Sequence, residues 1–553
     1  MNVLLESLDY HATAAPAGIA IARRKIDGSY EQTPWRSLHA QTLAFAEAFR
    51  ALPPDQIIPL CLAKSASCVA AMLGALAAGH AFSVLNQKLR PPQIAHILQA
   101  TGAPLALIDE AGLMAIKGAL AEPSPITQTH WLLLRGPNFA PMHQRLADEL
   151  AAKTKVTEWH GPAHDSGSHG PAQFAGPCSA STAQTACCLF TSGSTGTPKG
   201  VLISAADLHA RAAAEVDWYN LTFADILLSI LPFSFDVGLN QLLTCVLTGC
   251  QLVILDSWLP RDILKTAAER RVTGISSVPS IWLDFLTHNL AFDPAVHASL
   301  RYITLSGGDM SPHHLAKLPS IAPHAGIYKT YGQTEAFRAT SLKPNEFALH
   351  PGSVGRPFAG VNVYIVRPDG TLAAPNEPGE VVHTGLGTML GYLGTQQTDK
   401  LRPNPFLSAA DSNPMAIFTG DTGYLNDAGY LFLAGRSDDM LKIQGNRVYP
   451  SEIRDLLLSI EGIAQAEIVP LKSADQTQLA AFLILRPGAT HTSAAIRIAL
   501  AARAPSYMVP DTIIVKDSFP RTASGKPDRQ ALAAEIEKRV NEPQMGHRFT
   551  LIE

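Results

Sequence analysis

The first third of the chain alternates helical stretches with short apolar runs. Residues 41–52 and 68–78 have helical character; two prolines follow the first stretch and a glycine follows the second. The apolar runs at 58–62 and 105–108 are typical of strands that are buried on both faces. This alternation predicts a parallel sheet covered by helices on both sides, and therefore the α/β class.

The same alternation returns after residue 200 and then changes twice. We expect strands at 252–255 and 302–305, with a helix at 263–271 between them. From about 353 to 433, short alternating strands and frequent turns predict a smaller β-rich subdomain. Beyond residue 435 the pattern is mixed again. Two further helices are expected there, at 451–459 and 493–503.

The segment 158–184 differs in character from its surroundings because it is rich in His, Gly, Pro and Ser. We interpret it as a mobile loop or linker. Its three histidines, His160, His164 and His169, suggest metal binding at first sight. With no cysteine nearby and only Asp165 among them, solvated loop histidines are the better interpretation.

Length and composition narrow the possibilities further. A chain of 553 residues exceeds a single hydrophobic core, so at least two domains are expected. The net charge of −4 gives no electrostatic case for nucleic acid binding, and no apolar run is long enough to predict a membrane span. The N-terminus lacks the pattern of a signal peptide, and seven scattered cysteines do not suggest a disulfide framework. We therefore expect a cytoplasmic protein.

One short segment has the composition of a phosphate-binding loop. It follows an apolar stretch at 186–190 that predicts a strand, and it alternates hydroxyl side chains with glycines before a single lysine. Its residues are Thr191, Ser192, Gly193, Ser194, Thr195, Gly196 and Thr197, followed by Pro198 and Lys199. Glycines let the backbone approach a polyanion, and hydroxyl and ammonium groups bind phosphate oxygens. The spacing differs from the usual P-loop, because a proline stands where that pattern needs glycine.

Six further motifs follow this loop in order along the chain. They are Leu305-Ser-Gly-Gly-Asp309, Thr330-Tyr-Gly-Gln-Thr-Glu335, Phe418-Thr-Gly-Asp421, the run from Gly435 to Gly445, Pro505-Ser-Tyr-Met-Val-Pro510, and Arg521-Thr-Ala-Ser-Gly-Lys526. Together with the loop, this set closely resembles the adenylate-forming superfamily. That superfamily includes acyl-CoA synthetases, the adenylation domains of nonribosomal peptide synthetases, and luciferases. The resemblance covers nearly the whole chain.

The resemblance implies an organisation in two parts. A large N-terminal domain, 1–434, would contain two α/β subdomains and a β-rich subdomain, with the 158–184 loop inside it. A hinge at 435–440 would connect it to a small, mobile α+β lid domain at 441–535, followed by a tail at 536–553.

The resemblance also implies a reaction, in which ATP and Mg²⁺ activate a carboxylic acid as an acyl-adenylate and pyrophosphate is released. The loop and Lys199 would hold the departing phosphates, Thr334 would bind the same phosphates, and Glu335 would hold Mg²⁺. Around the nucleoside, Tyr331 would stack near adenine, Asp421 would accept the ribose hydroxyls, and Arg436 would support that contact. Gly307 and Gly308 are also expected at the nucleotide. Lys526 would be the catalytic lysine that bridges the substrate carboxylate and the α-phosphate.

A second half-reaction is implied by the motif that starts at Gly435. Asp438 occupies the hinge position about which the C-terminal domain of the family rotates. One orientation would present Lys526, and the other would present Lys442 and Gly445 for thioester formation. Two departures from the family pattern, Gln444 and Tyr449, concern only this thiol step.

The identity of the acid depends on the segment 231–241. The expected pocket residues are Phe235, Asp236, Gly238, Leu239 and Ser306. An aspartate at position 236 pairs with the substrate ammonium in amino-acid-activating relatives, whereas acyl-CoA ligases with a similar stretch also exist. Arg338 would either bind a second acidic group or form a structural pair. The residues around Glu335 favour an acyl-CoA or acyl-carrier ligase, and activation of an amino acid or β-amino acid remains the alternative.

The acyl acceptor is expected to be a separate molecule. No carrier domain follows Lys526, so we expect transfer in trans to coenzyme A or to a free-standing carrier protein. A binding or scaffolding relative without turnover is a different possibility, and so is a luciferase-like oxygenase. The presence of Lys199, Glu335, Asp421 and Lys526 argues for an active enzyme, and no motif favours the oxygenase.

Overall fold

The computed structural model describes most of the chain. The described residues are 3–120, 124–136, 140–159, 185–192, 198–308, 310–394, 398–407, 413–436, 441–443, 446–472, 477–522 and 524–541, without the side chains of 192, 442, 446–447, 472, 477 and 539–541. Within these ranges no helix is long and apolar enough to cross a membrane.

The first α/β unit contains a sheet in the order β19-β9-β8-β4-β3-β5-β6-β7, parallel from β8 to β7. Its strands are β3 (Ile57–Cys61), β4 (Ala81–Val84), β5 (Leu105–Ile108), β6 (His130–Leu134), β7 (Val156–Trp159), β8 (Thr185–Ser192), β9 (Pro198–Ser204) and β19 (Gly391–Tyr392). Its helices are α1 (Val3–Ala14), α2 (Trp35–Phe49), α3 (Ala66–Ala77), α4 (Pro91–Thr101), α5 (Glu110–Ile116), α6 (Pro125–Gln128) and α7 (Pro141–Ala151). The expected strands at 58–62 and 105–108 are thus present. The helix expected at 41–52 begins earlier, because Trp35 and Leu38 are already buried in the core.

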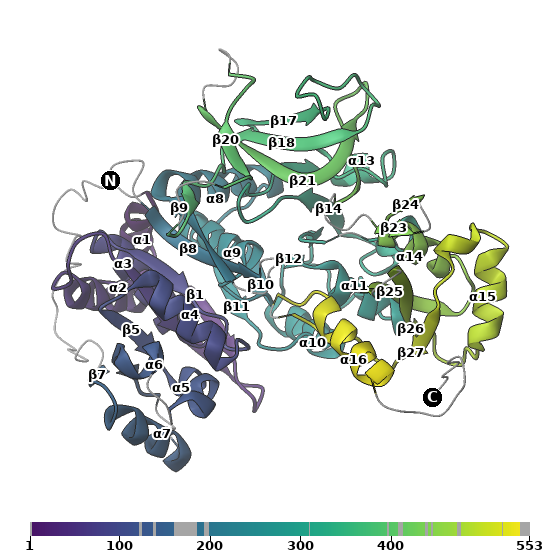
Figure 1. The fold of residues 1–553 in the computed structure, drawn as a ribbon. Coiled ribbons are helices and arrows are strands. Elements are labelled where there is room, and N and C mark those ends of the chain that lie inside the picture. The colour runs from purple at the N-terminus through teal and green to yellow at the C-terminus, as the bar shows by residue number, and fades with distance from the viewer. Residues whose placement is uncertain are drawn as a thin grey trace.

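The second α/β unit contains a larger sheet in the order β16-β15-β14-β13-β12-β10-β11-β1-β2. Its strands are β1 (Ile19–Arg24), β2 (Tyr30–Pro34), β10 (Ile226–Ser229), β11 (Gln251–Ile254), β12 (Gly274–Ser277), β13 (Tyr302–Leu305), β14 (Gly326–Tyr331), β15 (Thr340–Leu342) and β16 (Arg356–Pro357). Its helices are α8 (Ala205–Tyr219), α9 (Asp236–Thr248), α10 (Pro260–Arg270), α11 (Pro279–Thr287), α12 (Pro312–Leu315) and α13 (Pro344–Phe347), with a 3₁₀ turn at Leu318–Ser320. Both sheets carry helices, as Figure 1 shows, and the predicted α/β class is confirmed.

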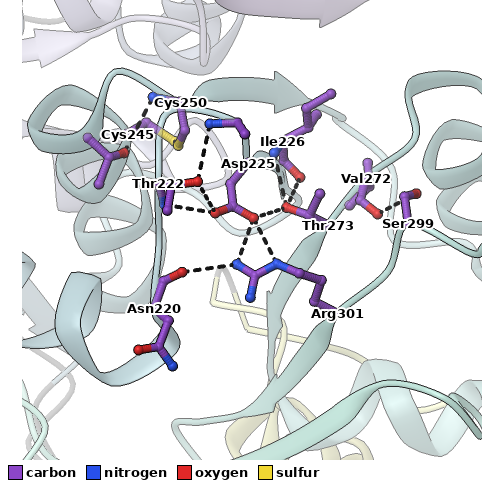
Figure 2. A network of polar contacts seen from close by, with 12 residues as sticks. Asn220, Thr222, Asp225, Ile226, Cys245, Cys250, Val272, Thr273, Ser299 and Arg301 are labelled. Carbon is purple, nitrogen blue, oxygen red and sulfur yellow. Dashed lines mark hydrogen bonds and ion pairs between the residues drawn. The ribbon is translucent and has the colours of Figure 1, made fainter.

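A buried carboxylate fixes the start of β10. Figure 2 shows Asp225 at the centre of a polar network just before this strand. Its Oδ1 accepts hydrogen bonds from the Thr273 hydroxyl at 2.6 Å and from Arg301 Nη2 at 2.7 Å, and its Oδ2 accepts from the Thr222 amide at 2.8 Å. Because Thr273 and Arg301 directly precede β12 and β13, the network aligns the amino ends of three parallel strands. The carboxyl ends of the same strands are thereby aligned as well.

The β-rich subdomain is an antiparallel sheet, drawn in green in Figure 1. Its strands are β17 (Val361–Val366), β18 (Gly379–Gly385), β20 (Leu401–Pro403), β21 (Met415–Leu425) and β22 (Leu431–Arg436). The central strand β21 pairs with β18, β20 and β22. The short alternating strands expected between 353 and 433 are therefore present, including the one at 361–366.

The C-terminal part forms a smaller α+β domain with its own hydrophobic core. Its elements are the hairpin of β23 (Leu441–Ile443) and β24 (Asn446–Val448), the sheet of β25 (Ile463–Lys472), β26 (Thr477–Leu485) and β27 (Thr512–Val515), and the helices α14 (Pro450–Leu458), α15 (Ser493–Ala501) and α16 (Arg529–Asn541). Helix α16 continues past residue 535, where the tail was expected, and it buries Ile536 in the core. The helix continues because this apolar side chain packs against β25 and β26.

Candidate active site

Three parallel strands bring the sequence motifs to one edge of the larger sheet. β10 leads into the pocket segment, β13 leads into Ser306 and Gly307, and β14 ends at Tyr331. The three strands lie close together in the sheet, in the order β14-β13-β12-β10, in which β12 separates β13 from β10. Their carboxyl ends therefore open onto a common region. Crevices at the carboxyl ends of parallel strands are where ligands bind in open α/β sheets.

The carboxylate of Asp421 lies in a preformed hydrogen-bond network. The Tyr331 hydroxyl donates to Oδ2 at 2.6 Å, and Gln333 Nε2 donates to the same oxygen at 2.7 Å. Arg436 Nε lies 3.5 Å from Oδ1, and the Thr419 hydroxyl accepts from the Asp421 amide at 3.1 Å. Burial, together with this carboxylate, holds the pKa of Tyr331 well above its usual range, so the phenol remains a donor. The Asp421 side chain is thus buried, with Oδ2 hydrogen-bonded and Oδ1 facing Arg436.

Glu335 is a second carboxylate whose orientation is fixed by neighbours. Its Oε1 accepts from the Tyr392 hydroxyl at 2.6 Å and from Lys400 Nζ at 3.2 Å, and the same ammonium donates to Gln333 Oε1 at 3.1 Å. Burial raises the pKa of Glu335, but Lys400 and Tyr392 outweigh burial and hold it below its ordinary value. The group is therefore an anion at neutral pH. Thr334 precedes it and is partly exposed.

This arrangement fits Mg²⁺ in the way that nucleotide enzymes hold it. In the described part of the chain, no group of three His, Cys, Asp or Glu side chains forms a metal cage. Mg²⁺ usually needs only one or two carboxylates, because water and substrate phosphates supply its other oxygen ligands. The ionised Glu335 supplies one such carboxylate.

The phosphate loop joins two antiparallel strands, β8 and β9. Thr191 and Lys199 are paired in their register, so the strands bring the two ends of the loop together. The Lys199 side chain is exposed, and its Nζ lies 5.6 Å from the centroid of the Tyr392 ring. Since Tyr392 also contacts Glu335, Lys199 lies near the expected metal ligand.

Lys526 reaches the region at the end of β13. Its Nζ lies 5.7 Å from the centroid of the Phe235 ring. A Cβ atom placed on Gly307 would lie 2.9 Å from Phe235 Cζ and 3.6 Å from Lys526 Cε. Gly307 also has φ +73°, a conformation that favours glycine. The backbone at Gly307 therefore lies against both side chains. Gly308 contacts Pro279, since a Cβ atom placed on Gly308 would lie 3.2 Å from Pro279 Cγ.

Contacts between the two domains hold the Lys526 loop in this place. The Ser280 hydroxyl donates to the Gly525 carbonyl, and Arg521 Nη2 pairs with Asp284 Oδ2 at 2.6 Å. Within the loop, the Thr522 amide donates to the Lys526 carbonyl at 2.7 Å. The described orientation of the C-terminal domain is thus one that presents Lys526 to the N-terminal domain.

Asp236, which the sequence predicts at the acyl pocket, is the first residue of α9. It is 9% exposed, and its Oδ1 has no hydrogen-bond partner among the described residues. Burial raises the pKa of Asp236, and the positive charges of Arg338 and Lys526 oppose that rise only in part. Burial in turn lowers the pKa of Lys526, against the attraction of Asp236. The two groups are electrostatically coupled without a direct ion pair.

Arg338 has a structural partner. Its Nη1 lies 2.6 Å from Glu215 Oε1 and donates to the Tyr219 hydroxyl at 2.7 Å. Both members of this ion pair are buried, at 4% and 2% exposure. Of the two interpretations of Arg338, structural pairing is therefore the one that the geometry supports.

The remaining expected pocket residues are mostly packed. Ser306 shares a hydrogen bond of 2.7 Å with the Thr330 hydroxyl, and Leu239 packs in the main hydrophobic core. A Cβ atom on Gly238 would lie 2.3 Å from the Pro232 carbonyl oxygen, so only glycine fits the close approach of α9 to the pocket segment. These three residues are therefore held in place by packing and hydrogen bonding.

Some expected residues lie outside the described part of the chain. They are the side chain of Ser192, then Gly193, Ser194, Thr195, Gly196 and Thr197 of the loop, His160, His164 and His169 of the 158–184 segment, the hinge residue Asp438, the side chain of Lys442, and Gly445. Conversely, the sequence did not predict three residues that contact Asp421 or Glu335. Gln333 lies inside one of the family motifs, whereas no local pattern marks Tyr392 or Lys400.

Comparison with known proteins identifies two matching family models. One, described as AMP-binding enzyme, matches residues 8–393, and the other, described as AMP-binding enzyme C-terminal domain, matches residues 452–526. Bacitracin synthase 3 of Bacillus licheniformis is 27% identical over 94% of this chain, which spans only 8% of that protein. D-alanine–D-alanyl carrier protein ligase of Bacillus cytotoxicus is 30% identical over 63% of this chain and 70% of its own length.

Solved structures with the same fold include two enzymes in complex with a nucleotide. ATP-bound MatB from Rhodopseudomonas palustris superposes with a TM-score of 0.76 at 20% identity, over 98% of this chain and 100% of that one. The anthranilate CoA ligase AuaEII in complex with anthranoyl-AMP gives a TM-score of 0.78 at 20% identity, over 98% of both chains. At this identity the likeness shows the fold, with its large N-terminal and small C-terminal domains.

Proposed function

Because the chain belongs to the AMP-binding enzyme family, we propose that it is an AMP-forming acid–thiol ligase. In the first half-reaction a carboxylate oxygen of the acid attacks the α-phosphorus of ATP. The bond between the α-phosphorus and its bridging oxygen to the β-phosphate breaks, and pyrophosphate leaves with that electron pair. No proton has to be moved, so the residues of the site act by binding and by stabilising charge.

The contacts of Asp421 support its proposed role at the ribose. Tyr331 and Gln333 already orient this carboxylate, so its remaining acceptor capacity faces the ligand without reorganisation. Mg²⁺, when bound, would neutralise phosphate charge, and Glu335 would hold it. Lys199 and the loop that precedes it would then bind the departing pyrophosphate.

The single observation that carries this proposal is the place of Lys526. Its ammonium lies 5.7 Å from the centroid of the Phe235 ring, its Cε lies near Gly307, and the charges of Asp236 and Asp421 act on it. An ammonium at this position can bind the acid carboxylate and an α-phosphate oxygen together. That bridging offsets the repulsion between two anions, which is the main electrostatic barrier to their reaction.

An exchange assay tests the adenylation step directly. Radiolabelled pyrophosphate is incorporated into ATP only when an acid is reversibly adenylated. The full chain is expected to show acid-dependent exchange in a panel that pairs plain carboxylic acids with their amino derivatives. Absence of acid-dependent exchange across the panel would contradict the proposal and favour a binding protein.

The second half-reaction transfers the acyl group to a thiol. The thiolate sulfur attacks the acyl carbon, a thioester forms, and AMP leaves with the electrons of the broken carbon–oxygen bond. We propose coenzyme A or a separate carrier protein as the thiol, with Asp438, Lys442 and Gly445 in the roles that the family motif gives them. Incubation with each thiol and mass detection of the thioester distinguishes the two acceptors.

Activation of an amino acid or β-amino acid is the second candidate, and one observation favours it. Asp236 has a buried oxygen without a hydrogen-bond partner among the described residues, and a substrate ammonium would satisfy it. In the exchange panel, Asp236→Asn should then impair amino acids selectively. An equal loss with plain acids would contradict a role for Asp236 in binding an ammonium.

A further inference from the structure

A cavity of about 320 Å³ lies between the two domains, away from the nucleotide and acyl regions. One wall comes from the end of α11 and the residues that follow it, and another from Lys317 and its neighbours in the N-terminal domain. Ala464 and Arg486 of the C-terminal domain complete the lining. The described orientation of the domains therefore completes the lining of the cavity.

The polar lining of this cavity is basic. Lys317 Nζ donates to His313 Nε2 at 2.8 Å, and Arg486 Nη2 lies 3.4 Å from the same nitrogen. Two fixed positive charges from different domains thus converge on one imidazole. His314 follows His313 in the chain and lines the cavity, and it shares a hydrogen bond of 3.0 Å with the Ser311 hydroxyl. We call His313, His314, Lys317 and Arg486 the interdomain basic cluster.

No acidic group balances this cluster within the described residues. Neither Lys317 nor Arg486 forms an ion pair with a carboxylate there. Burial lowers the pKa of His313, His314 and Lys317, and the charged neighbours that add to each shift are basic groups of the cluster itself. The pKa of His314 falls to about 4, so this ring is neutral at physiological pH. Like charges brought together across a domain interface are unfavourable unless an anion accompanies them.

The other side of the cavity is apolar. Phe285, Leu286 and Leu290 also line the cavity, together with Thr287 and Ser320, whose hydroxyls already donate to the carbonyls of Leu283 and Lys317. A cationic rim over an apolar wall suits an oxyanion that is attached to a small organic body. Free inorganic phosphate would use only the cationic half.

We propose that the interdomain basic cluster binds a phosphate group and thereby stabilises the domain orientation that presents Lys526. A ligand that binds one orientation more tightly shifts the population toward it, and the coupling is reciprocal. The gain in affinity comes from charge-assisted hydrogen bonds to Lys317 and Arg486. The consequence for turnover rests on the proposed function, whereas the binding itself does not.

Calorimetric titration of the full chain tests the binding without ATP or acid. The probes are inorganic phosphate and phenyl phosphate, which share the anion and differ in the apolar body. Both should bind to the wild type, and the double variant Lys317→Gln/Arg486→Gln should bind at least about tenfold more weakly. Tighter binding of phenyl phosphate would assign the site to an organic phosphate, and equal binding would assign it to the free anion.

Matched variants separate this site from other phosphate contacts. The control variant Lys265→Gln/Arg503→Gln removes the same two charges from exposed positions and should bind phosphate like the wild type. The charge-conserving variant Lys317→Arg/Arg486→Lys should retain phosphate binding. Melting temperatures of the variants check that each one folds. Equal affinity of the double glutamine variant and the wild type would overturn the proposal, since the phosphate would then bind elsewhere.

Hydrogen exchange reports the domain orientation independently of catalysis. Phosphate should slow amide exchange in residues 285–291 and 463–466, which face each other across the cavity, in the wild type but not in the double glutamine variant. No change in either segment, despite binding, would contradict the stabilising role. Since neither measurement uses turnover, an inactive enzyme would leave these results interpretable.

Discussion

Asp421 and Asp236 are both buried aspartates beside the same candidate site, and their surroundings differ sharply. Asp421 receives hydrogen bonds from Tyr331 and Gln333 and faces Arg436. Asp236 has a carboxylate oxygen without a partner among the described residues, and burial raises its pKa. Both side chains are similarly buried, at 8% and 9% exposure, so burial alone does not explain the difference.

The difference shows which end of the site is preorganised. At the Asp421 end, the protein supplies the donors and the carboxylate is fixed before a ligand arrives. At the Asp236 end, one carboxylate oxygen has no donor among the described residues. An unsatisfied buried polar group costs about 1–3 kcal/mol, a cost that a ligand with a suitable donor would remove. The charges of both carboxylates act on Lys526.

The largest expected effect is the loss of Lys526, because it removes the group that joins the two ends. Lys526→Ala should lower the rate of acid-dependent pyrophosphate exchange by about 10²–10³-fold or more, the range seen when one preorganised transition-state donor is removed. Lys516→Ala is the matched control, since Lys516 pairs with Glu535 within the C-terminal domain. Exchange at the control rate in the Lys526 variant would show that this ammonium does not bridge the reactants.

The next effect separates the two aspartates by substrate. Asp421→Asn should raise the KM for ATP by about tenfold or more, since a charged acceptor is worth about 1.5–3 kcal/mol. The KM for the acid should change little. Asp236→Asn should instead raise the KM for the acid and leave the KM for ATP unchanged. Initial rates of exchange at varied ATP and varied acid measure both, and a shift of the ATP KM in the Asp236 variant would break the comparison.

A smaller effect is expected from the glycine between Phe235 and Lys526. Gly307→Ala should reduce the free energy of unfolding by about 1–3 kcal/mol, because the position has φ +73° and the new Cβ would contact Phe235. Gly118→Ala is the control, because Gly118 has no positive φ and an added Cβ would meet no atom within 4 Å. Thermal denaturation measures the change. Equal melting temperatures for both variants would mean that the backbone at position 307 does not require glycine.

The smallest effect concerns the pH dependence that Asp236 gives to the free energy of unfolding. Between the ordinary pKa of Asp236, 3.8, and its raised folded value, the folded state holds a proton that the unfolded state has lost. Stability contributed by this group therefore falls as pH rises through that window and stays reduced above it. Asp236→Asn removes this cost and should raise Tm at neutral pH by about 1–2 °C.

Asp421→Asn should instead lower Tm, because it disrupts hydrogen bonds that the folded protein already makes. Differential scanning fluorimetry from pH 4 to 8 compares the variants with the wild type. An Asp236 variant less stable than the wild type at pH 7 would show that its carboxylate has a partner in the free protein.

The sequence predicted the parts of the site whose chemistry is local. The strand at 302–305 and the motif around Glu335 are continuous patterns, and the sheet topology places them at one edge. The partners of Glu335 were not predictable, because Tyr392 and Lys400 come from the β19 region and the segment before β20, far from any motif. The pairing of Arg338 with Glu215 likewise joins residues from α8 and from the loop after β14, which are distant in the chain.

The interdomain basic cluster is the clearest example of contacts that the sequence could not predict. His313 and Arg486 are separated by 173 positions and belong to different domains. Neither residue lies in a recognised motif, and a lone basic residue in sequence is usually a solvated surface group. Their convergence depends on how one domain is placed against the other, which no periodicity in the sequence encodes.

The short connection between the domains has a consequence for how they meet. β22 ends at Arg436 and β23 begins at Leu441, so the C-terminal domain is joined to the site by a few residues that start beside Asp421. A short covalent linker gives the two surfaces an effective concentration in the millimolar range, equivalent to about 4 kcal/mol relative to a 1 M reference. The contacts of Asp284 with Arg521 and of Ser280 with Gly525 therefore form between surfaces that the linker already holds near each other, without a search through solution.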